Sequence, residues 1–123
     1  MWLYSQSTGT LTAPDGSLAG QGYSGHGPGI NNAAMQNVPD VGPIPVGLYT
    51  IGPFRSDPEK GPLVCDLIPD PANEMFGRSG MMMHGDEILH LGERLASHGC
   101  IIQDHLVRLG VSKSADKRLQ VTS

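Results

Sequence analysis

Glycine and proline interrupt this chain too often for it to be built mainly from helices. The sequence contains 17 glycines and 10 prolines among 123 residues. A helix bundle or a coiled coil needs long runs without either residue. Turns must therefore be frequent, and the short hydrophobic blocks between them favour a β-rich fold over a disordered chain. The length is that of one domain, residues 1–123.

The charge pattern disfavours two classes of partner. The chain has 8 Lys and Arg against 12 Asp and Glu, for a net charge of -4, and Lys117-Arg118 is its longest basic cluster. Binding to nucleic acid through phosphate neutralisation is therefore not expected. No stretch reaches the roughly 18 apolar residues of a membrane-spanning helix, and residues 1–6 lack the basic and apolar regions of a signal peptide. We expect a protein made in the cytoplasm.

The first 24 residues predict a three-stranded meander. Segments 2–7, 11–13 and 17–24 are separated by the turn signals Thr8-Gly9 and Pro14-Asp15-Gly16.

The rest of the chain alternates loops with short strands. Residues 25–40 lack any period and predict a long surface loop, which in a small domain is often functional. Gly42-Pro43-Ile44-Pro45 predicts a rigid corner, because each proline fixes its own φ. Further strands are expected at 47–54, 63–68, 81–83 and 118–122, with a polar turn at 55–62 and a loop at 69–80.

Two of these strands predict core positions. Leu63, Cys65 and Leu67 share one face, so Cys65 is interpreted as a buried small hydrophobic residue. The Met81–Met83 run predicts a strand buried on both faces that delivers His84 to its end. Its flexible thioethers could instead line an acyl pocket.

One helix is expected near the C-terminus. Ile102, Leu106 and Leu109 follow the spacing i, i+4, i+7, residues 103–104 supply a polar first turn, and Gly110 suits the position after the helix.

The residues between His84 and Cys100 contain the parts that cysteine catalysis needs. Cys100, placed just before the predicted helix, would be a nucleophile whose thiolate is favoured by the helix dipole. His84 would be the base. Gly99 permits a sharp turn, and the amides of Gly99 to Ile101 could form an oxyanion hole.

These residues also match a known family. His84-Gly85, followed by Ser97-His98-Gly99-Cys100, resembles the signature of L,D-transpeptidase (YkuD-like) catalytic domains. Further segments resemble a narrower group, the L,D-transpeptidase-related effectors of type VI secretion systems: residues 4–9, 23–25, 31–32, 42–49 and 84–86.

The resemblance implies a β-rich sandwich or barrel with one short helix after Cys100, acting on peptidoglycan stem peptides without a cofactor. In such enzymes the cysteine attacks the carbonyl of a diamino acid, releases a terminal D-amino acid and passes the acyl group to water or to an amine. Carried over by position, Cys100 is the nucleophile, His84 the base, and the Gly85 carbonyl orients the imidazole. Ser97, His98 and Gly99 are supporting residues of the site.

The resemblance leaves substrate binding open. Ile102 stands where wall-anchored enzymes often have an arginine, so Arg78 and Arg94 are candidates for binding a substrate carboxylate. Further candidate substrate-binding residues are Tyr23, Asn31, Asn32 and Ile101. Asn31 and Asn32 could instead only provide left-handed turn geometry.

The implied biology is delivery into the periplasm of a neighbouring cell by a secretion apparatus, with a cognate immunity protein covering the Cys100 cleft. One alternative is a housekeeping or phage-borne wall enzyme. Another is a non-catalytic peptidoglycan-binding module on the same scaffold.

Simpler interpretations exist for the histidines and cysteines. His84, His90, His98, His105 and Cys100 could bind zinc, but their spacing matches no compact metal motif. A Cys65–Cys100 disulfide would consume the nucleophile. His26 and His105 are expected at the surface or beside the helix, whereas the roles of His98 and Asp86 stay open.

Overall fold

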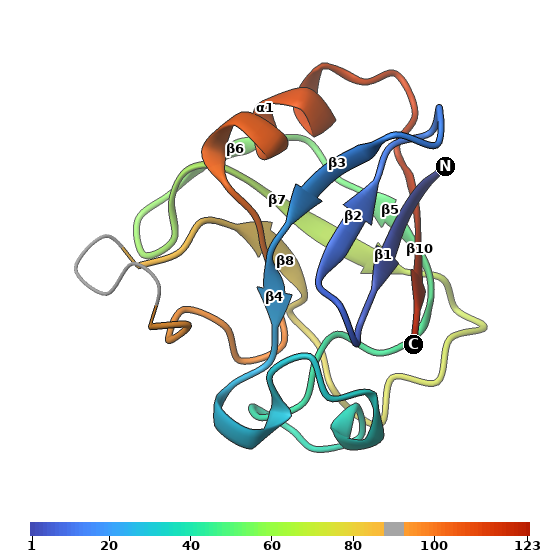
Figure 1. Cartoon of the computed structure of the whole chain (residues 1–123), viewed down its shortest axis with the longest axis vertical. Coiled ribbons are helices and arrows are strands. Elements are labelled where there is room, and N and C mark those ends of the chain that lie inside the picture. Colours follow the sequence, from blue (N-terminus) through green and yellow to red (C-terminus); the bar gives the residue numbers. More distant parts are fainter. Residues whose placement is uncertain (88–92) are drawn as a thin grey trace.

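Short strands dominate the structure, a computed structural model that describes residues 1–87 and 93–123. The strands are β1 (Trp2–Ser5), β2 (Thr10–Thr12), β3 (Leu18–Gln21), β4 (Tyr23–Ser24), β5 (Gly47–Ile51), β6 (Arg55–Asp57), β7 (Gly61–Pro69), β8 (Met82–His84), β9 (Ile101–Ile102) and β10 (Arg118–Thr122). The helices are α1 (His105–Lys113) and the 3-10 turns η1 (Gly27–Gly29) and η2 (Ala33–Met35). The prediction of a mainly β fold with one short helix is confirmed (Figure 1).

The strands curl into a nearly closed barrel. The ten-stranded sheet of the described residues runs β3-β2-β1-β10-β5-β7-β8-β9-β4, with β6 paired to β7 beside this path. Its two end strands, β3 and β4, are separated in the chain by Gly22 alone. A Cβ at Gly22 would overlap the Ile102 carbonyl oxygen, so glycine is required where the chain crosses from one edge of the sheet to the other.

The last strand lies in the middle of the sheet. β10 pairs in parallel with β1, where Trp2 faces Leu119, and antiparallel with β5, where Tyr49 faces Leu119. The two ends of the chain are thereby joined side by side (Figure 1). The bounds of β10 match those of the strand predicted at 118–122.

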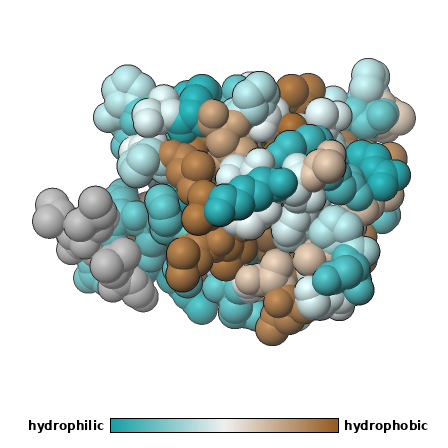
Figure 2. Space-filling view, turned by 90° about the horizontal axis from the view of Figure 1, so that it is seen from above, coloured by the Kyte–Doolittle hydropathy of each residue, from teal (hydrophilic) through white to brown (hydrophobic). Residues whose placement is uncertain are grey.

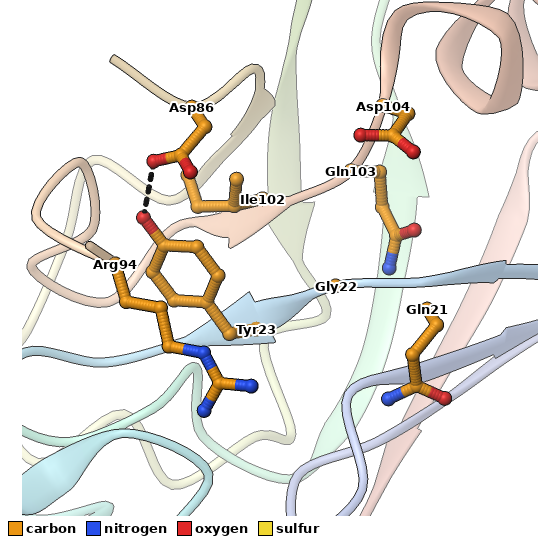
Figure 3. Close-up of a pocket in the computed structure, with 8 residues that line it drawn as sticks. All are labelled: Gln21, Gly22, Tyr23, Asp86, Arg94, Ile102, Gln103 and Asp104. Carbon is orange, nitrogen blue, oxygen red and sulfur yellow. Dashed lines mark hydrogen bonds between the residues drawn. The ribbon is translucent and has the colours of Figure 1, made fainter. Parts of the chain in front are cut away.

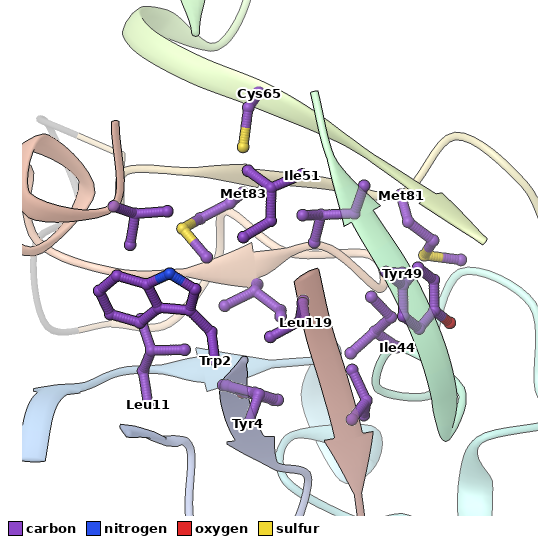
Figure 4. Close-up of a cluster of buried hydrophobic side chains, with 14 residues drawn as sticks. Trp2, Tyr4, Leu11, Ile44, Tyr49, Ile51, Cys65, Met81, Met83 and Leu119 are labelled. Carbon is purple, nitrogen blue, oxygen red and sulfur yellow. The ribbon is translucent and has the colours of Figure 1, made fainter. Parts of the chain in front are cut away.

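The barrel interior is filled from almost every strand. Its buried residues include Trp2, Tyr4, Leu11, Ile44, Tyr49, Ile51, Cys65, Leu67, Met81, Met83, Ile101, Val111, Leu119 and Val121 (Figure 4). Cys65 is fully buried, as predicted, and burial raises the pKa of its thiol to about 12.

Several strand predictions need correction in detail. The segment predicted as one strand at 17–24 is two strands that belong to opposite edges of the sheet. The polar turn predicted at 55–62 contains β6, which pairs with β7 through Arg55 and Val64. Leu63 has a φ of 56°, so the chain leaves the extended conformation there and Leu63 does not join Cys65 in the core cluster. Met82 is only half-buried, so β8 is not buried on both faces.

The predicted helix lies further along the chain than expected. α1 begins at His105 with Asp104 as its N-cap, whereas Ile102 belongs to β9 and Gly110 lies inside the helix. Leu106 is 78% exposed, and the buried residues of α1 are Arg108 and Val111. The face of the molecule at the α1 end accordingly shows hydrophobic side chains beside hydrophilic ones (Figure 2). No helix in the described ranges has the length and apolar character needed to span a membrane.

The central place of β10 predicts a strong dependence of stability on its core residue. We expect Leu119→Ala to lower the free energy of unfolding by about 2–5 kcal/mol, because it leaves a cavity between two partner strands. The matched control Leu48→Ala, on neighbouring β5 and 46% exposed, should change it by less than about 0.5 kcal/mol. Urea unfolding measures both variants, and equal losses would contradict the assigned core.

Candidate active site

The parallel pairing of β8 with β9 brings Cys100 and His84 to one face of the sheet. Met83 faces Ile101 and His84 faces Ile102 in this register. Met83 and Ile101 point into the barrel core, so their neighbours on each strand point the opposite way. Continuing the register by one residue sets Cys100 opposite Met82. Cys100 and His84 are therefore two residues apart along the strand direction and one strand apart across the sheet. This corresponds to a Cα spacing of about 8 Å.

His84 is a buried imidazole with one nitrogen fixed and the other unpartnered. Its Nδ1–H donates to the Gly85 carbonyl at 2.9 Å, which leaves Nε2 as the acceptor. Nε2 is buried and has no hydrogen-bond partner among the described residues. Burial lowers the pKa of His84, and the positive charges of Lys60 and Arg108 act in the same direction. The side chain is therefore a neutral imidazole whose basic nitrogen is available.

Cys100 does not lie at a helix N-terminus. β9 separates it from α1, so the helix dipole cannot favour its thiolate as predicted. Burial raises the pKa of the Cys100 thiol, an effect that a backbone hydrogen bond from Met82 and the charges of Lys60 and Arg78 only reduce. The thiol is half-buried and unoxidised, and Sγ lies 3.9 Å from the Gly80 carbonyl oxygen. Before substrate binds, Cys100 is a neutral thiol.

Ser97 and Ser24 fix the turn that precedes Cys100. The buried Ser97 hydroxyl accepts the Gly99 amide at 3.1 Å and donates to the Cys100 carbonyl at 2.6 Å. It also accepts the Gly25 amide at 3.0 Å. Ser24 Oγ donates to the Gly99 carbonyl at 3.1 Å. Ser97 engages the Gly99 amide, and the Ile101 amide belongs to the β8–β9 ladder. The Cys100 amide is therefore the remaining candidate for an oxyanion hole.

Two buried arginines pack against the two glycines of the site. Gly99 has a φ of 133°, and a Cβ there would overlap Nη2 of Arg78. A Cβ at Gly85 would lie 2.6 Å from Nη2 of Arg108. Arg78 is 8% exposed and Arg108 6% exposed. A side chain at either glycine would therefore displace a guanidinium group.

Most of the predicted substrate-binding residues already have structural partners. Ile101 is fully buried in the core, so its side chain cannot contact a substrate, contrary to the prediction. Asn31 has a φ of 51° and accepts the Ser24 amide through Oδ1. Asn32 caps η2 by accepting the Ala34 amide. Asn31 thus has the left-handed turn geometry that was the alternative to substrate binding, whereas Asn32 is extended, with a φ of -112°.

Tyr23 and Arg94 line a pocket of about 160 Å³ beside the His84 end of the site (Figure 3). The Tyr23 hydroxyl donates to Asp86 Oδ1 at 2.7 Å and accepts the Ala96 amide at 3.0 Å. It therefore connects the segment after His84 to the segment before Ser97. The Arg94 guanidinium lies 6.0 Å from the Tyr23 ring centroid, close enough for a cation–π contact. Arg94 is exposed, unlike Arg78.

His98 faces the long 25–40 loop. Its ring stacks on His26 with the centroids 4.7 Å apart, and its Nδ1–H donates to the Asp40 carbonyl at 3.3 Å. With Arg78 and Met81, it lines a second pocket, of about 220 Å³, on the Cys100 side of the site.

The remaining alternatives concern metals and disulfides. The described residues contain no group of three or more His, Cys, Asp or Glu side chains that could hold a metal ion. His90, one of the predicted zinc candidates, lies outside the described residues. Cys65 and Cys100 are both free thiols.

Comparison with known proteins assigns a family to this arrangement. A family model described as the Tlde1 domain matches residues 19–122, which include every part of the site described above. The chain belongs to the Tlde1 domain family. This is a family of type VI secretion effectors, which implies secretion and delivery to target cells. No curated protein and no solved structure matches the chain.

Two positively charged residues near the site of this Tlde1 domain, Lys60 and Arg108, were not predicted from the sequence. Lys60 acts electrostatically on both Cys100 and His84 from the turn between β6 and β7. Arg108 donates to the Gln103, Pro62 and Leu63 carbonyls while its Nη2 contacts Gly85. The pairing of β7 with β8 brings both cations close to His84, and no local pattern signals it.

The lowered pKa of His84 predicts a pH-dependent stability. An unfolded chain protonates His84 near its ordinary pKa of about 6.5, whereas the folded chain resists protonation. The contribution of His84 to the free energy of unfolding is therefore fully present above about pH 6.5, and it is lost as the pH drops from there toward the folded-state pKa. We expect urea unfolding between about pH 7 and pH 5 to show this loss.

The variants His84→Gln and His105→Gln test the assignment. His84→Gln should flatten the pH dependence, whereas His105→Gln, at an exposed position, should retain it. Asp57, whose pKa is lowered to about 2 by hydrogen bonds from the Lys60 amide, Arg55 and the Glu59 amide, acts only at lower pH. An unchanged slope in His84→Gln would show that another group titrates in this range.

Proposed function

We propose that this Tlde1 domain is a cysteine L,D-transpeptidase or L,D-carboxypeptidase that acts on peptidoglycan stem peptides. The observation that carries the proposal is the joint placement of Cys100 and His84 on one face, with Nδ1 of His84 fixed by Gly85 and Nε2 unpartnered. A module that only binds peptides has no need for a buried, basic imidazole beside a thiol. The resemblance of the His-Gly and Ser-His-Gly-Cys motifs supplies the substrate class.

The protonation states favour a general-base mechanism. The Cys100 thiol and the His84 imidazole are both neutral at rest, because burial raises the pKa of Cys100 and lowers that of His84. His84 Nε2 removes the thiol proton as Sγ attacks the peptide carbonyl. The approach of the two side chains tightens when substrate fills the site, as is common for catalytic hydrogen bonds.

The same proton then serves the second half of the reaction. His84 donates it to the nitrogen of the leaving D-amino acid as the carbon–nitrogen bond breaks, which leaves an acyl-thioester on Cys100. A water molecule or an amine, deprotonated by His84, attacks the thioester and restores the thiol. Water gives carboxypeptidase activity, and an amine gives transpeptidase activity.

Digestion of purified muropeptides tests this chemistry. Wild type should release a terminal D-amino acid from tetrapeptide stems or exchange it for an added D-amino acid, as measured by mass spectrometry. Cys100→Ala should abolish both products, and His84→Gln should slow them by about 10²–10⁴-fold. Cys65→Ala is the matched control, because it removes the other thiol from a position within the core. Unchanged muropeptides with wild type, or full activity in Cys100→Ala, would refute the proposed reaction.

We also propose that the target compartment is the periplasm of a neighbouring cell, and that an immunity protein covers the Cys100 face in the producer. Expression in a susceptible bacterium should arrest growth only when the wild-type chain carries a periplasmic export signal. The exported Cys100→Ala variant should be harmless. Killing by the unexported chain, or equal killing by Cys100→Ala, would argue for a different target, and survival with exported wild type would favour a housekeeping enzyme.

A further inference from the structure

Arg78 is a buried cation whose hydrogen bonds are all made to backbone carbonyls. Among the described residues no carboxylate lies within ion-pair distance of its guanidinium. A buried charge is costly unless polar groups compensate it, and for Arg78 backbone carbonyls supply the hydrogen bonds that a carboxylate would otherwise accept. Its acceptors are the carbonyl oxygens of Gln36 at 2.6 Å, Pro43 at 2.7 Å, Gly42 at 2.9 Å and His98 at 3.4 Å.

These acceptors belong to two segments that meet behind the nucleophile. Gln36, Gly42 and Pro43 come from the end of the long loop and the proline corner, whereas His98 belongs to the turn that precedes Cys100. The planar fork of an arginine presents five donors in a fixed geometry, so it can hold several carbonyls in defined directions. Arg78 therefore links the turn before Cys100 to the proline corner through hydrogen bonds.

The contact with Gly99 sets Arg78 directly behind the Cys100 backbone. Nη2 occupies the space that a side chain at position 99 would fill. The Gly99 peptide is thus held on three sides, by Ser97 at its amide, by Ser24 at its carbonyl and by the guanidinium at its Cα. Removal of the guanidinium would leave a gap behind the residue that precedes the nucleophile.

The charge of Arg78 also acts on the thiol. The charged groups that face Cys100 are Lys60, Arg78 and Asp66. Lys60 and Arg78 favour the thiolate, whereas Asp66 on β7 opposes it. Of the two cations, Arg78 is the one with hydrogen bonds to the turn itself.

We propose that Arg78 is a positioning residue for Cys100, which fixes the Gly99 peptide and holds a positive charge behind the nucleophile. The inference rests on the proposed function for its catalytic meaning. Thiol reactivity tests it without any peptidoglycan substrate. Arg108 makes the equivalent contact at Gly85, so both glycines of the site are supported by a buried guanidinium.

The experiment measures the rate of Cys100 alkylation by iodoacetamide against pH. Cys65 is fully buried and has a pKa of about 12, so the reaction reports Cys100, which Cys100→Ala verifies. In wild type the midpoint should lie above the ordinary thiol value of about 8.5, because burial raises the pKa. Arg78→Met should raise the midpoint further and slow alkylation near neutral pH by about tenfold for each pKa unit.

Two variants make the result specific. Arg78→Lys keeps the charge but loses the fork, so its midpoint should fall between those of wild type and Arg78→Met. Arg118→Met removes an arginine that pairs with Asp116 far from the turn, and it should leave the profile unchanged. Circular dichroism establishes that each variant is folded, and sucrose at low temperature keeps weakened variants native.

The outcomes separate the two proposals. A wild-type midpoint in either folded Arg78 variant overturns the role of Arg78, whatever the muropeptide assay shows. Unchanged muropeptides with wild type refute the proposed function and leave the alkylation result standing as a property of the thiol.

Discussion

The register between β8 and β9 is the constraint on which the candidate site depends. Because Met83 and Ile101 both pack into the barrel core, the strands cannot slip by one residue without exposing them. The same register fixes His84 and Cys100 on the opposite face. Core packing therefore determines the geometry of the candidate site, and no hydrogen bond between the two side chains is needed to hold them in place.

Around that register, the polar groups fix the backbone and leave Nε2 of His84 without a hydrogen-bond partner. Ser97 and Arg78 bind the peptide groups next to Cys100, and Gly85 binds only the Nδ1 side of His84. Both reactive groups stay neutral, because burial opposes charge on either one. The candidate site thus holds a neutral thiol and a neutral imidazole, in contrast to a preformed ion pair of thiolate and imidazolium.

Short sequence patterns predicted those features of the protein that depend on residues close together in the chain. The strand predicted at 118–122 has the bounds of β10, and the two motif residues His84 and Cys100 lie on one face of the sheet. The helix was misplaced because Ile102 and Leu106 match a helical period by coincidence, one lying in a strand and the other facing solvent. The true buried face of α1 includes Arg108, which no hydrophobic pattern marks. Arg78 was equally invisible as a structural residue, because its carbonyl partners are 20 to 42 residues away in sequence.

The position of β10 also determines whether the sheet is continuous. Its pairings join the beginning of the chain to its end, and such distant contacts close slowly. Until β10 is in place, β1 and β5 present two unpaired edges to solvent, which are sites for aggregation. A partly unfolded chain in which β10 is not docked therefore carries Cys100 on an open sheet.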